Sequence, residues 1–341
     1  MIKLLSGGPG GLAPRLGSGA RTRKLRALLG AALLLGTVSA CGLDINTALP
    51  YSISPGSIQP IPSLKDVKIT VGSKDFTENI ILAYMAEMAL SAAGADIVDL
   101  SDIKGSNSSR QALLTGQTDV TWEYTGTGWI NYQGNELPVP GGEKAQYEAT
   151  AKADKEKFGV TWLNYSPLND QYAFAVTEAY GAKNNLKTTS DLANFLKQKP
   201  DQGVFCLETE FTSRQDGFPA AVKAYGFQNP KIENFGIGTI YSAVSGGTCP
   251  VGEVFTTDGR ISGLNLRVLE DDKKAFPQYN AVATLRTGFL EQHPDIRGPL
   301  ETVSAAIDNK QMIDLCKKVD VDGQDTGKVA HDWMLSKGFI K

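Results

Sequence analysis

The segment TWEYTGTGWINY (residues 121–132) leads from a strand-like stretch into a turn that is rich in aromatic side chains. It holds four aromatic residues, two glycines and three threonines. Glycine lets the backbone bend sharply and approach a ligand closely, and tyrosine and tryptophan offer stiff π faces that attract cations. Taken alone, the segment is typical either of a strand end with a packed turn or of a ligand site, so the flanking sequence has to decide.

The sequence before this segment alternates between strand-like and helix-like patterns. Hydrophobic periodicity predicts strand, helix, strand, short helix and strand at residues 67–71, 75–94, 96–100, 109–114 and 120–124. Asp75 and Glu78 have capping-box spacing, which predicts that the first helix begins there. Such alternation predicts a mainly parallel sheet that binds ligands beyond the carboxyl ends of its strands. Lys74 and residues 124–129 both follow strand ends, so we expect them to share one crevice.

A second α/β unit follows, and its first helix is expected to be capped by Ser190. The whole pattern predicts an α/β fold of two lobes, with the second lobe inserted into the first. We expect lobe I over residues 66–176 and 272–341, and lobe II over residues 177–271. Two crossings between the lobes make a hinge, and the cleft between such lobes is a favoured ligand site.

The N-terminus has the pattern of an export signal. Residues 1–40 carry six basic side chains and no acidic one, and a basic stretch at 21–26 precedes an apolar run at 27–38. Small residues then precede Cys41, as in a bacterial lipobox, so we expect residues 1–40 to be a lipoprotein signal peptide and Cys41 to be lipidated. An ordinary signal peptide or a buried Cys41 is the alternative. The proline-containing residues 41–65 are expected to tether the folded body to the outer face of the cell membrane.

Charge and residue usage exclude several classes of function. Of the 34 basic residues, 28 remain after the six in residues 1–40, against 37 acidic ones, which gives a net charge of −9. A nucleic-acid-binding protein is expected to show a basic stripe, and none is seen in the sequence. There is no Gly-x-Ser-x-Gly or Walker motif, so we do not expect an enzyme.

Cysteine and histidine usage gives two further expectations. Outside the cytoplasm cysteines can pair, and we expect a disulfide between Cys206 and Cys249, with Cys316 as a buried free thiol. The two histidines, His293 and His331, have no cysteine or histidine at ligand spacing, so neither a metal site nor another cofactor is expected.

Five segments together give the chain a family resemblance. They follow one another in the family's order: GSKDFTE (72–78), WEYTGT (122–127), RQDG (214–217), VFTTDGRI (254–261) and FPQYNA (276–281). Over residues 67–341 the chain resembles the substrate-binding proteins of osmoprotectant ABC importers. These proteins bind quaternary ammonium compounds such as glycine betaine, carnitine, choline and proline betaine. The resemblance implies the periplasmic-binding-protein (Venus flytrap) fold, a monomer, and delivery of the ligand to an ABC permease with its cytoplasmic ATPase.

The resemblance also implies which side chains bind the ligand. It assigns an aromatic cage around the ammonium group to Tyr124, Tyr172, Phe255 and Tyr279, and the ligand's carboxylate to Lys74, Thr127 and Arg214. A trimethylammonium group has no N–H to donate, so aromatic faces suit it better than hydrogen-bond acceptors do. Arginine can hold a carboxylate through two parallel bonds.

Some alternatives to this assignment stay open. Family members usually carry tyrosine where this chain has Phe255, which leaves room for another methylated zwitterion or an amino acid as the ligand. Lys74 beside Asp75, and Arg214 near Asp216, are also typical of structural ion pairs. A sensor or scaffold lipoprotein on the same fold is a further alternative.

Overall fold

The computed structural model describes residues 51–137 and 141–341. The expected signal peptide, residues 1–40, and the expected lipidation site, Cys41, lie outside the described residues. Within the described ranges, no helix is both long enough and apolar enough to span a bilayer.

The first sheet has five strands in the order β2-β1-β3-β10-β4. Their bounds are Lys68–Lys74 (β1), Asp96–Ile103 (β2), Val120–Tyr124 (β3), Val160–Trp162 (β4) and Ala281–Arg286 (β10). β1 runs parallel to β2 and β3, whereas β10 is antiparallel to β3 and β4. Four of the five strands therefore run in the same direction, as expected, and β10 alone is antiparallel because the chain returns from the second lobe through it.

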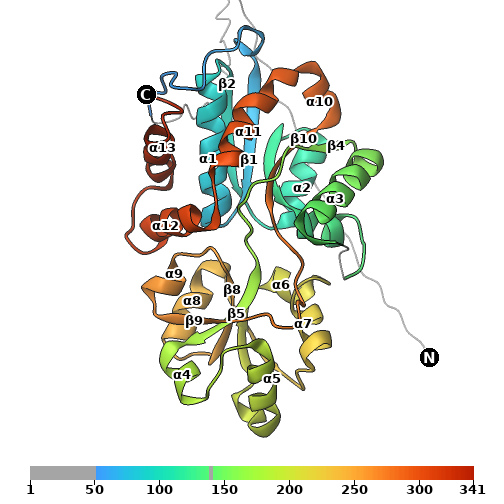
Figure 1. Cartoon of the computed structure of the whole chain (residues 1–341), viewed down its shortest axis with the longest axis vertical. Helices are drawn as coiled ribbons and strands as arrows, with labels where there is room; N and C mark the ends of the chain where they lie inside the picture. The colour runs from blue at the N-terminus through green and yellow to red at the C-terminus, as the bar shows by residue number, and fades with distance from the viewer. Residues whose placement is uncertain (1–50, 138–140) are drawn as a thin grey trace, which may run out of the picture. The chain divides into compact units, whose positions relative to one another are not determined.

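Helices cover this sheet and complete lobe I (Figure 1). They are α1 (Thr77–Ala92), α2 (Ser106–Thr115), α3 (Gly142–Phe158), α10 (Thr287–Gln292), α11 (Arg297–Ala306), α12 (Asn309–Asp320) and α13 (Thr326–Ser336). α1 is buried on most of its surface because it packs on β1 and β2 and also contacts α11, α12 and α13. A π-helical segment, Thr127–Tyr132, continues the chain after β3.

The second sheet also has five strands, in the order β7-β6-β8-β5-β9. Their bounds are Tyr172–Thr177 (β5), Val204–Leu207 (β6), Lys231–Asn234 (β7), Val251–Phe255 (β8) and Leu266–Leu269 (β9). The helices of lobe II are α4 (Glu178–Lys183), α5 (Thr189–Gln198), α6 (Thr209–Ser213), α7 (Phe218–Tyr225), α8 (Ile237–Ser245) and α9 (Arg260–Gly263). Cys206 on β6 and Cys249 just before β8 form a disulfide, and Cys316 on α12 is a buried free thiol.

The first crossing between the lobes lies earlier in the chain than expected. The sequence places residues up to 176 in lobe I, but β5 pairs with β8 and β9 and so belongs to lobe II. The two crossing segments lie side by side, since Asn169 and Asn280 form an isolated bridge and the Tyr279 amide donates to the Asn169 side chain. This corrects the boundary at residues 176–177, because strand pairing rather than hydrophobic pattern decides which sheet a strand joins.

Two helix starts also differ from expectation. α1 begins after Phe76, without a side-chain cap, and the Asp75 carboxylate accepts the Gly105 amide instead of capping the helix. α5 is capped by Thr188, which forms a capping box with Asp191, rather than by Ser190.

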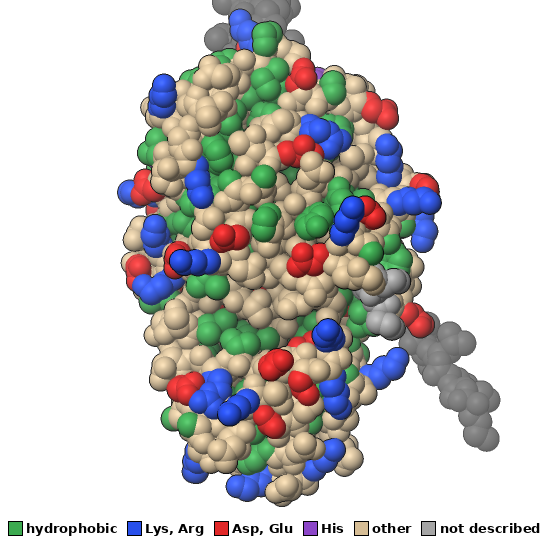
Figure 2. All heavy atoms as spheres, viewed as in Figure 1, with side chains coloured by type: hydrophobic (Ala, Val, Ile, Leu, Met, Phe, Trp, Pro, Cys, Tyr) green, Lys and Arg blue, Asp and Glu red, His purple; other side chains and the backbone are tan. Residues whose placement is uncertain are grey.

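The last part of the expected tether is packed on lobe I. Residues 51–58 run along the C-terminus, where Ser54 and Lys341 exchange two backbone hydrogen bonds. Ile58 and Leu64 are buried in the core. Residues 51–64 of the expected tether therefore belong to the folded body, and residues 41–50 lie outside the described residues. The visible face of the molecule mixes acidic and basic side chains (Figure 2).

Candidate ligand-binding site

A cavity of about 520 Å³ lies between the two lobes. Lobe I contributes the carboxyl ends of β1 and β3 and the start of α2, and lobe II contributes α6 and the facing ends of β5 and β8. The seven ligand-binding residues expected from the sequence all line it: Lys74, Tyr124, Thr127, Tyr172, Arg214, Phe255 and Tyr279. The carboxyl ends of parallel strands meet at one edge of a sheet, which explains why Lys74 and Tyr124 come together.

Aromatic rings form a continuous cluster along the cavity. Tyr172 and Phe255 are register partners on β5 and β8, with ring centroids 5.4 Å apart. Tyr279 meets Tyr172 edge to face at 5.3 Å. Phe76 joins Tyr124 to this group, because its ring lies 5.9 Å from Tyr124 and 5.0 Å from Phe255.

Phe76 is a member of this cluster that the sequence assignment omitted. It lines the same cavity and follows the end of β1 by two residues. Its place after a strand end was the available signal, since side chains there face the binding edge of the sheet.

Hydrogen bonds fix the orientation of the aromatic side chains. The Tyr124 hydroxyl donates to Glu78 at 2.8 Å, and the Tyr279 hydroxyl donates to Asp216 at 2.9 Å. Rings that are held in this way lose little further freedom when a ligand binds, which favours affinity.

Buried carboxyl groups lie beside the aromatic cluster. Burial raises the pKa of Glu78 to about 7, although hydrogen bonds from Thr257 and Tyr124 oppose the shift. Burial and the nearby Glu78 also raise the pKa of Asp170, which lines the cavity. Thr257 of lobe II donates to Glu78 of lobe I at 2.6 Å, so this contact links the two lobes. From the sequence Glu78 is expected only to cap a helix, and no role is expected for Asp170.

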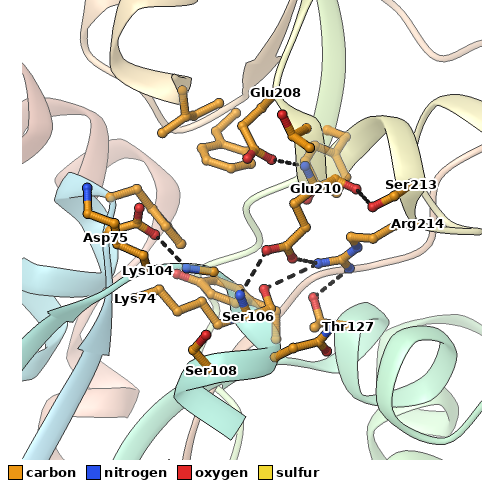
Figure 3. Close-up of a pocket in the computed structure, with 18 of the residues that line it drawn as sticks. Lys74, Asp75, Lys104, Ser106, Ser108, Thr127, Glu208, Glu210, Ser213 and Arg214 are labelled. Atoms are coloured by element: carbon orange, nitrogen blue, oxygen red, sulfur yellow. Dashed lines mark hydrogen bonds and ion pairs between the residues drawn. The ribbon is translucent and has the colours of Figure 1, made fainter. Parts of the chain in front are cut away.

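Arg214 is held by protein groups on every donor. Its Nε and Nη2 bond the two oxygens of Asp216, at 2.8 and 2.5 Å. Nη2 also donates to Thr127 at 2.9 Å, and Nη1 donates to Glu210 at 2.9 Å and to Ser106 at 3.5 Å (Figure 3). The structural pairing with Asp216 is thus present, and Arg214 also connects lobe II to lobe I.

Lys74 is likewise paired within the protein. Its ammonium group lies 2.8 Å from Glu123, and both side chains are almost fully buried. The same ammonium lies 5.1 Å from the centre of the Tyr124 ring. The partner of Lys74 is therefore Glu123 and not its neighbour Asp75.

Comparison with known proteins gives the family. The family described as the substrate-binding domain of the ABC-type glycine betaine transport system matches residues 67–336. The chain belongs to this family. Substrate-binding proteins of ABC importers work outside the cytoplasm and are transport components rather than enzymes.

Relatives and solved structures agree with membership of the glycine betaine transport family. A glycine-betaine-binding protein of Pseudomonas aeruginosa is 32% identical over 273 residues, which cover 78% of this chain and 86% of the relative. The glycine betaine-binding protein YehZ of Escherichia coli (strain K12) is 30% identical over 291 residues, covering 83% and 94%. A crystal structure described as a glycine betaine/carnitine/choline ABC transporter superposes with a TM-score of 0.65 at 27% identity, covering 80% of this chain and 99% of the other. The expected two-lobed fold is confirmed.

Proposed function

We propose that this substrate-binding protein captures a quaternary ammonium osmoprotectant between its lobes and delivers it to an ABC permease. The observation that carries the proposal is the continuous cluster of aromatic rings along the cavity. Its members are Phe76, Tyr124, Tyr172, Phe255 and Tyr279. Glycine betaine, carnitine, choline and proline betaine all carry the bulky, weakly hydrated cation that such rings favour.

The energetic scale supports the proposal. Each contact between a cation and an aromatic face contributes roughly 0.5–2 kcal/mol, and more where water is excluded. Micromolar binding needs about 8 kcal/mol in total. Four or five ring contacts together reach this scale before the cost of ordering the ligand and the lobes is subtracted.

The resemblance also assigns Lys74, Thr127 and Arg214 to a ligand carboxylate, and this assignment stays a prediction. Thr127 and Arg214 contact each other across the cleft, and Lys74 lies against the Tyr124 ring. A carboxylate that reached these groups would have to share donors now used by Glu123, Asp216 and Glu210.

The proposal includes attachment and partners. The names of the relatives support an extracytoplasmic binding protein that serves an ABC transporter. We propose that Cys41 carries the lipid anchor that holds a monomer at the membrane, where it presents the closed lobes to the permease.

Titration calorimetry with glycine betaine, carnitine and choline tests the proposal. Tyr124→Ala should abolish detectable binding because it removes one face of the cage, whereas Tyr124→Phe keeps the ring and should retain binding of the cation. Tyr165→Ala is the matched control, since this half-buried tyrosine lies outside the lining of the cavity and packs against Tyr147 with its ring tilted by 47°. Unchanged affinity in Tyr124→Ala would refute the cage.

A further inference from the structure

Glu210 occupies the position at which a ligand carboxylate would be expected. It lies on α6 of lobe II, and its Oε1 accepts from Arg214 at 2.9 Å. Its Oε2 accepts from the backbone amide of Ser106, the first residue of α2 in lobe I, at 2.8 Å (Figure 3). A guanidinium group and a helix N-terminus are together the groups that bind an anion, and here a side chain of the protein itself fills that place.

The cationic donors of Arg214 and Lys74 are already paired, so a ligand carboxylate finds no free partner among them. The remaining donors of Arg214 are used by Asp216, Thr127 and Ser106. The Lys74 ammonium is paired with the buried Glu123. A zwitterion would therefore have to displace Glu210 and leave its charge partly buried in the cleft, which is costly.

The balance of acidic and basic residues around the cavity also disfavours a ligand carboxylate. Its lining contains three basic residues, Lys74, Lys104 and Arg214, and four acidic ones, Asp75, Asp170, Glu208 and Glu210. Two of the basic residues are also paired with the further carboxylates Glu123 and Asp216. Although burial acts to raise it, the pKa of Glu210 is lowered overall by Arg214, Ser106 and Lys74, so this carboxylate stays ionised.

We propose that Glu210 is a specificity-determining residue that makes the cleft favour a quaternary ammonium cation without a carboxylate over a zwitterion. The inference rests on the proposed function and narrows it to one class of ligand charge. Because the Glu210 side chain also joins the two lobes, its loss should weaken closure around every ligand. The ratio of two affinities removes that shared effect and isolates the role in selectivity.

The test is calorimetric titration of the purified chain with choline and with glycine betaine, two trimethylammonium ligands that differ in carrying a carboxylate. The wild type should bind choline at least about tenfold more tightly. Glu210→Gln keeps the shape but removes the charge, and should shift the affinity ratio toward glycine betaine by at least about tenfold. Glu233→Gln, an exposed position on β7 of the same lobe, is the matched control and should leave the ratio unchanged.

The outcomes separate this inference from the proposed function. If both ligands bind and the wild type prefers glycine betaine, or Glu210→Gln leaves the ratio unchanged, the role of Glu210 is refuted while the cage stands. If the wild type binds neither ligand, the proposed function fails and the inference fails with it. Glu210→Asp retains the charge and should keep the preference for choline, which covers the case in which Glu210→Gln does not fold.

Discussion

Glu87 gives the sharpest test of the energetics of lobe I. It lies on α1 with no exposed surface, and among the described residues neither of its carboxylate oxygens has a hydrogen-bond partner. Burial, followed by the negative charge of Asp99 on β2, raises its pKa from 4.5 to about 9. Between these two values the folded protein holds a proton that the unfolded chain releases. The free energy of unfolding therefore falls as the pH rises from about 4.5 to about 9.

Glu87→Gln should remove this pH-dependent loss. At pH 7 the loss amounts to about 3.5 kcal/mol, because the pH is then 2.5 units above 4.5 and each unit corresponds to about 1.4 kcal/mol, and about 0.4 kcal/mol of it is already lost at pH 4.5. A neutral amide at this site does not titrate, so the comparison between two pH values isolates the charge of Glu87. Urea unfolding followed by circular dichroism should show a change from the substitution that is about 3 kcal/mol more favourable at pH 7 than at pH 4.5.

The control for Glu87→Gln is Glu143→Gln, an exposed position at the start of α3, which should change the free energy of unfolding little at either pH. Glu78 titrates in wild type and variant alike, so its contribution cancels in the difference. An effect of Glu87→Gln that is equal at pH 4.5 and pH 7 would refute the assignment of a buried, protonated Glu87.

Two further predictions concern lobe closure and the N-terminal segment. A methyl group at Gly259 of lobe II would lie 2.2 Å from the backbone nitrogen of Lys317 on α12, far inside contact distance. Gly259→Ala should therefore hold the lobes apart. Calorimetric titration should show ligand binding that is weaker by at least about tenfold. Gly288→Ala, where the added methyl meets nothing within 4 Å, should bind normally, and equal affinities would contradict the closure argument. A chain that begins at Leu64 should melt several degrees below one that begins at Tyr51, because burial of Ile58 contributes about 2 kcal/mol to stability. Calorimetric scans measure the two melting temperatures. Equal values would show that residues 51–63 add no stability.

Much of the architecture follows from local sequence patterns. The alternation of strand and helix through residues 67–124 survives in β1, α1, β2, α2 and β3, because each segment has the period and breakers of its own element. Strand pairing is different in kind. From the sequence β5 is expected to belong to lobe I, yet it pairs with β8 and β9 of lobe II. The pattern of its own six residues does not indicate which strands it pairs with.

The binding site divides in the same way. The family resemblance of the sequence implies seven ligand-binding side chains, and all seven line the cavity. It omitted Phe76 and gave Glu78 only a local role, because the ring of Phe76 meets Phe255 and the carboxylate of Glu78 meets Thr257 only after the two lobes come together. The ion pair between Arg214 and Glu210 was likewise not predicted from the sequence.

By itself, the sequence determined the family, through five segments that occur in the family's order, and the two-lobed α/β class, through the alternation of strand and helix along the chain. The aromatic cage followed from the family resemblance. Only the tertiary structure decided which sheet β5 joins, that Lys74 pairs with Glu123, and that Glu210 fills the anion position between Arg214 and the N-terminus of α2. The physical reason is that ion pairs and hydrogen bonds act over a few ångströms in space. Their partners lie far apart in the chain, where no local pattern can connect them.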